Sequence, residues 1–335
     1  MIAQLVLSAV VVFAAVPAKK VPVRKSPART MRASSAPVQS AYRKSPYVGA
    51  ISFDCSTGKV ISEFNADAAA YPASVTKLMT LLLVLEDVRA GKYSFDTDVV
   101  ATPEAYYCEP SWVGIKVGEK MSVKSLCMAL MVESANDAAI VLGVHSAGSF
   151  SGFVARMNAR AAELGMSSTH YYNPNGLPPN SGKRYPWKSF NVSTARDQLK
   201  LAQKLVAMPE TLSLTSIKTC DLVRCPDGYR VSVTRRTNEP LCTTTLAAGE
   251  KVVKQLRNHN NIMRTDKLKI VNPDGKEAID GLKTGYIDAG GSSIVLTGSR
   301  SGKRVIVVVL GSSSSKERDD KALNLMKDAL GAVAW

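Results

Sequence analysis

The sequence predicts an α+β fold in which helices flank an antiparallel sheet. Strand patterns occur near both ends of the chain, in residues 48–64 and 279–310. Helical patterns fill residues 78–85 and 122–170, and a last helix is expected at residues 316–334. Strands at both ends with helices between them favour one sheet that takes strands from both ends of the chain.

The N-terminal elements are a strand hairpin and a buried helix. Residues 48–53 and 60–64 have strand composition and are separated by turn residues, which predicts an antiparallel pair. Residues 78–85 are apolar on every side, which predicts a helix in the middle of the molecule. Pro72 suits the entrance of that helix, so we expect Ser74 in its first turn.

The middle and C-terminal elements follow from the same kinds of pattern. Three helices are predicted, at residues 122–133, 137–145 and 153–164. Three successive antiparallel strands are predicted after them, at residues 279–287, 292–298 and 304–310. A tight turn at residues 301–303 joins the last two strands.

The composition describes an ordinary globular protein preceded by a distinct N-terminal region. Of the 335 residues, 45% are hydrophobic and 21% are charged, which excludes a disordered, collagen-like or disulfide-dominated chain. Residues 5–16 form an apolar run too short to cross a bilayer comfortably, and small residues follow it. We therefore predict that residues 1–18 are a signal peptide or a short anchor, and that the protein is exported to the periplasm or cell envelope.

Residues 19–46 are predicted to be a basic linker rich in proline and serine. They carry eight of the 43 Lys and Arg residues and no acid, so the rest of the chain is near +7 out of a formal total of +15. A segment with so few large apolar residues cannot form a packed core. Its positive charge allows weak contact with a membrane or with wall polymer. No nucleic-acid motif is present, so we expect no nucleic-acid partner.

The six cysteines do not indicate a disulfide framework or a metal site. Cys127 lies in an apolar run and is predicted to be buried. Cys220, Cys225 and Cys242 lie within 23 residues, and one disulfide among them is compatible with an oxidising compartment. The three histidines have no ligand-pair spacing to these cysteines, so we expect no metal and no cofactor.

Three short motifs occur in order along the chain, and together they indicate nucleophilic catalysis. They are Ser74-x-x-Lys77, Ser134-x-Asn136 and Lys283-Thr284-Gly285. Each motif alone is weak, because Ser313-x-x-Lys316 and Ser189-x-Asn191 match the first two patterns by chance. Ser313 follows the Lys-Thr-Gly triplet instead of opening a helix, and Ser189 is flanked by loop residues. The three motifs named first, by contrast, occur in a consistent order, with consistent spacing and in fitting surroundings.

The first motif places an amine beside a hydroxyl. Lys77 lies three residues after Ser74 on the same helix face, so its amine can reach the Ser74 hydroxyl. A serine becomes a good nucleophile when a neighbouring base takes its proton. Lys77 can be that general base only when neutral, which requires a lowered pKa. Burial, the positive end of the helix and a second cation at Lys283 would all lower it.

The other two motifs are predicted to bind substrate and to move a proton. Ser134 lies where one helical pattern ends, so its hydroxyl can pass a proton between Lys77 and a leaving amine. The carboxamide of Asn136 can hold a substrate amide, because it donates and accepts at once. Lys283 and Thr284 form a receptor for a terminal carboxylate, and Gly285 allows a ligand close to the backbone.

The segments around these motifs resemble the serine-type D-alanyl-D-alanine carboxypeptidases, the low-molecular-weight penicillin-binding proteins. The resemblance covers residues 47–335. It is carried by residues 72–80, 132–139, 153–158, 164–166, 173–177 and 280–286.

The resemblance implies a penicillin-recognising, serine transpeptidase-like fold, with a mostly helical subdomain beside the sheet and the site between them. Residues 47–335 are then the catalytic domain. By family role, Ser74 attacks the carbonyl between the last two D-alanines of a peptidoglycan stem peptide, and water releases the acyl group after D-alanine has left. β-Lactam antibiotics act as covalent inhibitors. The backbone N–H groups of Ser74 and Tyr286 form the oxyanion hole.

Two related activities and one unrelated role are the alternatives. A D,D-endopeptidase that cuts peptidoglycan cross-links uses the same catalytic residues. A class A β-lactamase-like hydrolase needs a Glu in a Pro-rich loop, and Glu163 lies in a helical pattern instead. The unrelated role is that of a wall-binding module with an inactive site. The presence of all three motifs argues against this role, because an inactive site does not need every reactive group.

Some segments depart from the family pattern. Residues 177–193 and 220–250 are longer than the usual connections, so the rim of the cleft is expected to differ. Residues 258–263 resemble a site-proximal Asn-x-Asn stretch, in which His259 has no firm role. The chain ends shortly after the last predicted helix, so we expect it to lack the C-terminal β-domain and membrane-binding helix of many relatives.

Overall fold

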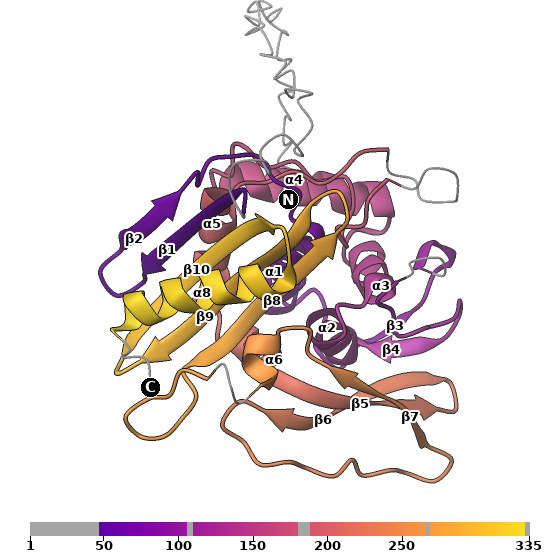
Figure 1. The fold of residues 1–335 in the computed structure, drawn as a ribbon. Helices are drawn as coiled ribbons and strands as arrows, with labels where there is room; N and C mark the ends of the chain where they lie inside the picture. The colour runs from indigo at the N-terminus through magenta and orange to yellow at the C-terminus, as the bar shows by residue number, and fades with distance from the viewer. Residues whose placement is uncertain (1–46, 106–109, 180–187, 266–268, 332–335) are drawn as a thin grey trace, which may run out of the picture. The chain divides into compact units, whose positions relative to one another are not determined.

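Strands from both ends of the chain form one five-stranded antiparallel sheet, in the order β2-β1-β10-β9-β8 (Figure 1). This confirms the shared sheet predicted from the sequence. The computed structural model describes residues 47–105, 110–179, 188–265 and 269–331. The strands of this sheet are β1 (Gly49–Asp54), β2 (Lys59–Phe64), β8 (Ile279–Ile287), β9 (Gly291–Arg300) and β10 (Lys303–Ser312).

Some predicted features lie outside the described residues. They are the signal peptide or anchor at residues 1–18, the linker at residues 19–46 and the last residues of the helix expected at 316–334. The observed C-terminal helix is α8 (Ser315–Leu330). Gly331 ends it in the left-handed conformation, with φ 62°, which is a common way for a helix to stop.

Alternation along β10 gives the sheet two apolar faces. Val305, Val307 and Val309 pack in a cluster with residues of α8, which lies across the front of the sheet in Figure 1. The intervening residues, including Ile306 and Val308, belong to the larger core cluster on the other face. Because successive strand residues point to opposite faces, one valine-rich strand serves both layers.

The larger cluster is built around α1 (Lys77–Arg89), whose residues 78–85 are at most 3% exposed. This confirms the buried helix predicted from an all-round apolar pattern. The other helices also match their predicted positions to within a few residues where a prediction was made. They are α2 (Val123–Val132), α3 (Asn136–Ala147), α4 (Phe150–Glu163), α5 (Ala195–Val206), α6 (Pro209–Thr215) and α7 (Asn261–Arg264).

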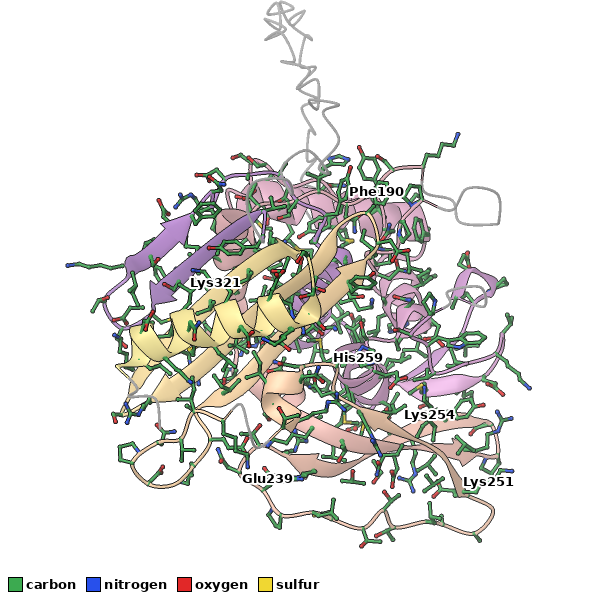
Figure 2. The ribbon with its side chains drawn as sticks, viewed as in Figure 1. Phe190, Glu239, Lys251, Lys254, His259 and Lys321 are labelled. Atoms are coloured by element: carbon green, nitrogen blue, oxygen red, sulfur yellow. The ribbon has the colours of Figure 1, made fainter. Side chains whose placement is uncertain are left out.

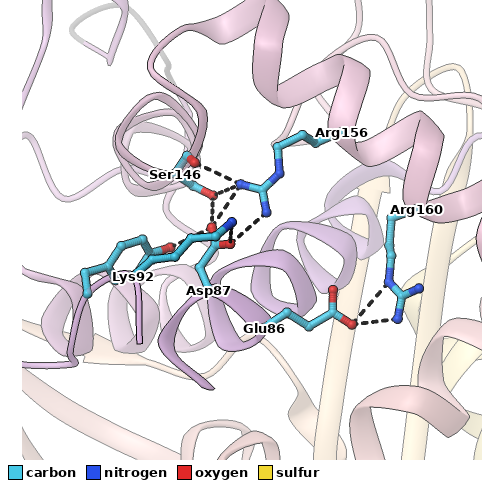
Figure 3. Close-up of polar contacts among 7 residues, drawn as sticks. Glu86, Asp87, Lys92, Ser146, Arg156 and Arg160 are labelled. Carbon is cyan, nitrogen blue, oxygen red and sulfur yellow. Dashed lines mark hydrogen bonds and ion pairs between the residues drawn. The ribbon is translucent and has the colours of Figure 1, made fainter. Parts of the chain in front are cut away.

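Figure 3 shows a polar cluster centred on Asp87, near the C-terminal end of α1. Arg156 from α4 donates to the Asp87 carboxylate at 2.8 Å, and Lys92 donates at 2.6 Å. The hydroxyl of Ser146 from α3 donates to the same carboxylate. Burial raises the pKa of Asp87, but these hydrogen bonds outweigh it and lower the pKa to about 2. The cluster therefore ties the far end of α1 to two neighbouring helices.

A second five-stranded sheet, in the order β3-β4-β6-β5-β7, was not predicted from the sequence. The pairing of β4 with β6 is parallel and the other pairings are antiparallel. Its strands are β3 (Asp98–Val100), β4 (Lys120–Ser122), β5 (Ile217–Cys225), β6 (Gly228–Arg236) and β7 (Lys251–Arg257). Most of residues 220–250, which the sequence indicated only as a long connection, is therefore a hairpin of this sheet.

The described cysteines carry free thiols. Cys220, Cys225 and Cys242 are not bonded to one another, so the disulfide considered for this stretch is not formed. Cys127 is 0% exposed, which confirms its prediction as a small buried apolar residue.

No single helix in the described part of the chain is long and apolar enough to cross a membrane. Helices α3 and α4 pass the same test of length and composition only when taken together, and they are bent by 86° at their junction.

Candidate active site

Ser74 lies in a short 3-10 turn, η2 (Ala73–Thr76), that leads directly into α1. We expected it in the first turn of the helix, and the structure places it just before α1. Ala73 has φ 50°, a left-handed conformation that costs energy for a residue with a Cβ atom. Such a conformation next to a serine is typical of functional sites, where surrounding structure holds the strain.

Lys77 is fully buried and its Nζ atom meets three oxygens. It lies 2.9 Å from Ser74 Oγ, as the one-turn spacing predicted. It also donates to Asn136 Oδ1 at 2.7 Å and to the backbone oxygen of Asn175 at 2.7 Å. The structure thus brings the first predicted motif and Asn136 of the second into direct contact.

The second motif occupies the connection between α2 and α3. Ser134 is buried and has φ 60°, and Asn136 is the first residue of α3. The side-chain N–H of Asn136 donates to the backbone oxygen of Pro110. The amide of Asn136 is therefore held at both ends, with its oxygen toward Lys77 and its nitrogen toward Pro110.

Strand β8 brings the third motif against the serine turn. A Cβ atom added to Gly285 would lie 2.6 Å from the Pro72 oxygen and 3.0 Å from the Ser74 nitrogen. Only glycine allows this approach of two backbones. The side chain of the next residue, Tyr286, is 61% exposed, and its hydroxyl donates to Asp288 at 2.8 Å.

Lys283 and Thr284 are 2% and 5% exposed. The Lys283 ammonium donates to the Thr284 backbone oxygen at 2.9 Å. Burial, together with the positive charge of Arg318, lowers the pKa of Lys283 to about 7. This cation is therefore only partly charged near neutral pH in the free protein.

The loop of residues 173–177, which the sequence marked only by its resemblance to the family, completes the surroundings of Lys77. A Cβ atom on Gly176, which has φ 84°, would lie 1.9 Å from the Ala73 oxygen. The Thr80 hydroxyl of α1 donates to the Pro174 oxygen at 2.7 Å. The loop thus packs tightly against the serine turn and presents the Asn175 carbonyl to Lys77.

Asn191, which we treated as part of a chance match, supports this loop. Its side-chain nitrogen donates to Thr76 Oγ1 and to the Asn173 oxygen, both at 3.0 Å. Its side-chain oxygen accepts from the Tyr172 nitrogen at 2.7 Å. Asn191 is therefore a support for the site rather than a member of it, and its position in a polar loop gave no sequence signal for this role.

His259 lies in the turn between β7 and α7 (Figure 2). Desolvation lowers the pKa of His259 to about 4, and the positive charges of Lys283 and Lys77 act in the same direction. The imidazole is therefore neutral at pH 7. The flanking Asn258 and Asn260 are buried and shape the turn, since Asn258 Oδ1 accepts from the Asn260 nitrogen at 2.9 Å.

Within the described residues, no three His, Cys, Asp or Glu side chains are grouped so that they could hold a metal ion. The site groups the hydroxyls of Ser74, Ser134 and Thr284 with the amines of Lys77 and Lys283 and with several amide groups.

The fold and this arrangement of groups define the penicillin-binding protein class. The family model described as D-alanyl-D-alanine carboxypeptidase matches residues 47–314, and the chain belongs to that family.

Individual relatives agree with this assignment. D-alanyl-D-alanine carboxypeptidase DacF of Bacillus subtilis (strain 168) is 26% identical over 277 residues, which are 83% of this chain and 60% of that protein. The crystal structure of the D-alanyl-D-alanine carboxypeptidase DacD from Francisella tularensis has a TM-score of 0.69 and 29% identity, covering 84% of this chain and 69% of that one.

A third relative has been solved with an antibiotic. Penicillin-binding protein D2 from Listeria monocytogenes, in its ampicillin-bound form, has a TM-score of 0.62 and 29% identity over 84% of this chain and 96% of that one. The present chain spans about 60% of the length of the first curated relatives it matches.

Proposed function

We propose that this protein is a serine D,D-carboxypeptidase that removes the terminal D-alanine from peptidoglycan stem peptides through an acyl-enzyme on Ser74. β-Lactams acylate the same serine. The observation that carries the proposal is the 2.9 Å separation of Lys77 Nζ from Ser74 Oγ, with two carbonyl oxygens each 2.7 Å from the same nitrogen.

Two carbonyl partners of the Lys77 amine support its role as general base. Carbonyl oxygens only accept, so Asn136 and Asn175 each take one N–H of the amine. A neutral amine has just two N–H groups, and its lone pair then faces the Ser74 hydroxyl. In that state Ser74 donates to Lys77, and the proton moves to the amine as Ser74 Oγ bonds to the substrate carbonyl carbon.

Ser134 completes the first half of the reaction. The proton taken by Lys77 passes through the Ser134 hydroxyl to the nitrogen of the departing D-alanine as the peptide bond breaks. Water then attacks the ester carbon and gives a proton to Lys77. The proton returns to Ser74 Oγ as the ester bond breaks, which restores the free enzyme.

Developing negative charge on the carbonyl oxygen is stabilised by the backbone N–H groups of Ser74 and Tyr286. The close contact between Gly285 and the Ser74 nitrogen supports this assignment, because it places the two segments side by side. Preorganised donors of this kind contribute about 3 to 4 kcal/mol each to transition-state stabilisation.

Recognition of the substrate tail falls to Asn136 of the second motif and to the third motif. Asn136 binds the penultimate amide, and the Lys283 ammonium with the Thr284 hydroxyl binds the terminal carboxylate. Export to the periplasm or cell envelope, directed by residues 1–18, places the enzyme beside this substrate. The basic residues 19–46 make weak membrane or wall contact.

The direct test is the intact mass of the full chain with and without penicillin. We expect one penicilloyl adduct on the unmodified protein and none on Ser74→Ala, and release of D-alanine from a stem pentapeptide by the unmodified protein but not by Ser74→Ala. Ser313→Ala is the matched control, because Ser313 also begins a Ser-x-x-Lys sequence, and it should react normally.

Two outcomes would contradict the proposal. An adduct that persists in Ser74→Ala would remove Ser74 from the chemistry. Cleavage of cross-linked muropeptide dimers without release of D-alanine from the pentapeptide would favour the D,D-endopeptidase instead.

The contact at Gly285 gives a second prediction. Gly285→Ala should slow penicillin acylation about a hundred-fold, because the new methyl group must push β8 away from the serine turn by part of an ångström. The measurement is the second-order acylation rate. Gly58→Ala, at a left-handed glycine in the turn between β1 and β2 where a Cβ atom would meet nothing within 4 Å, should lower stability by about 1 kcal/mol and leave that rate unchanged. Equal rates for the two variants would show that β8 does not need this close approach.

A further inference from the structure

Asp137 is a fully buried carboxylate next to a site residue, and neither the motifs nor the proposed chemistry uses it. Four backbone N–H groups point at it. The Gly114 nitrogen donates at 2.9 Å, and the Val113 and Ile115 nitrogens donate at 3.2 and 3.3 Å. The fourth donor is Ala138 of its own helix, at 2.9 Å.

The carboxylate and the segment that surrounds it depend on each other. Burial raises the pKa of the Asp137 carboxyl above its usual value, and the four N–H groups offset part of this rise because they favour the charged form. Asp137 also lies in the first turn of α3, where the helix dipole favours negative charge. If residues 113–115 moved away, the protein would contain a buried charge without its hydrogen bonds, which is costly.

The same segment holds Asn136. The Ser111 oxygen accepts from the Asn136 backbone nitrogen at 2.8 Å, and the Pro110 oxygen accepts from the Asn136 side-chain nitrogen. Ser111 has φ 61° and Gly114 has φ 78°, so the segment has an irregular shape that other contacts must maintain. With its nitrogen held on this side, the Asn136 amide directs its oxygen to Lys77 at 2.7 Å.

We propose that Asp137 is a positioning residue for the reaction: it holds residues 110–115 so that they fix the amide of Asn136, which in turn keeps Lys77 directed at Ser74. The inference rests on the function proposed above. Asp137 does not take part in the chemistry itself, and its effect passes through Asn136.

The first test is Asp137→Asn in the full chain. This substitution keeps the size of the side chain but replaces one acceptor oxygen by an N–H group that faces backbone N–H donors. We expect penicillin acylation to slow ten- to a hundred-fold, and the amides of residues 113–115 to exchange with solvent faster. Asp54→Asn is the matched control. Asp54 is another buried carboxylate that holds a turn, accepting from the Ser56 and Thr57 nitrogens at 2.8 and 3.2 Å.

The acylation rate of Asp54→Asn should lie within about two-fold of the rate of the unmodified protein, as expected for a site distant from the reacting groups. A normal acylation rate in Asp137→Asn would overturn the inference. If that variant does not fold, Asp137→Glu keeps the charge and lengthens the side chain by one methylene. It should also acylate slowly, and a normal rate there would overturn the inference equally.

A double-variant cycle separates positioning from a general loss of structure. If Asp137 acts through Asn136, adding Asp137→Asn to Asn136→Ala should slow acylation by no more than about two-fold beyond Asn136→Ala alone. If the two substitutions slowed acylation by independent factors, so that the double variant were slowed by their product, the inference would be overturned. The unmodified protein is measured first: failure of its own acylation counts against the proposed function, whereas the exchange rates of residues 113–115 test the role of Asp137 without reference to activity.

Discussion

Replacing Lys77 by arginine should slow the acylation of Ser74 by penicillin about a thousand-fold. Arginine keeps the positive charge and can donate to the carbonyls of Asn136 and Asn175, but it does not lose its proton at any accessible pH. It therefore cannot accept the proton of the Ser74 hydroxyl. The measurement is the rate of adduct formation by intact mass.

Lys92→Arg is the control for this substitution. Lys92 donates to Asp87 at 2.6 Å in the polar cluster at the other end of α1. The Lys92→Arg variant should retain the ion pair with Asp87, and penicillin should acylate it at the normal rate. Acylation of Lys77→Arg at a rate near that of the unmodified protein would show that another group takes the serine proton.

Replacing Lys283 by methionine should stabilise the fold below pH 7 while weakening the binding of substrates that end in a carboxylate. Lys283 is 2% exposed, and burial with the nearby Arg318 lowers its pKa to about 7. Below that pH the folded protein holds a poorly solvated ammonium. Replacing buried charges by apolar groups of similar volume commonly stabilises a protein by about 1 to 4 kcal/mol.

The pH dependence of this gain follows from the direction of the pKa shift. An unfolded lysine titrates near pH 10.4, so between pH 7 and 10 the unfolded state binds more protons at this position than the folded state. Stability of the unmodified protein therefore rises with pH across that range, and the advantage of Lys283→Met shrinks. Urea unfolding of Lys283→Met and of the unmodified protein at pH 6 and pH 9 measures this difference in the free energy of unfolding.

Lys59→Met, at an exposed lysine on β2, is the control for Lys283→Met. It should show no pH-dependent gain in the free energy of unfolding. For activity, the KM of a stem peptide should rise in Lys283→Met. A variant whose stability relative to the unmodified protein is the same at pH 6 and pH 9 would show that the Lys283 ammonium carries no desolvation cost.

The first sheet was predictable because its strands carry strong local signals, whereas the second was not. Residues 303–312 alternate between two apolar layers, and α1 is apolar on all sides. By contrast, six of the seven residues of β7 are exposed, so no period of two appears, and β3 and β4 have only three residues each. Contacts between distant segments, such as the ion pair of Arg224 on β5 with Glu119 beside β4, give no signal in the local sequence.

The groups of the candidate site can likewise be divided into those that the sequence predicted and those that it did not. Side chains whose chemistry is distinctive at fixed spacing, such as Ser74 with Lys77, were found from sequence and are 2.9 Å apart. The backbone carbonyl of Asn175 was not found, because its contact with Lys77 has no signature in the residue type. Asn191 and Asp137 were missed because their role is to hold loops, which becomes visible only when distant segments are brought together.

The pairing of β1 with β10 has a consequence for the time at which the fold can form. Gly49 near one end lies opposite Leu310 near the other, so the sheet that carries Gly285 cannot close until almost the whole described chain has been made. At about 5 to 20 residues per second, synthesis separates these two strands by roughly ten seconds or more. During that interval β1 has no partner on its β10 side, so the sheet that carries Gly285, and with it the candidate site, cannot form before residues 303–312 have been synthesised.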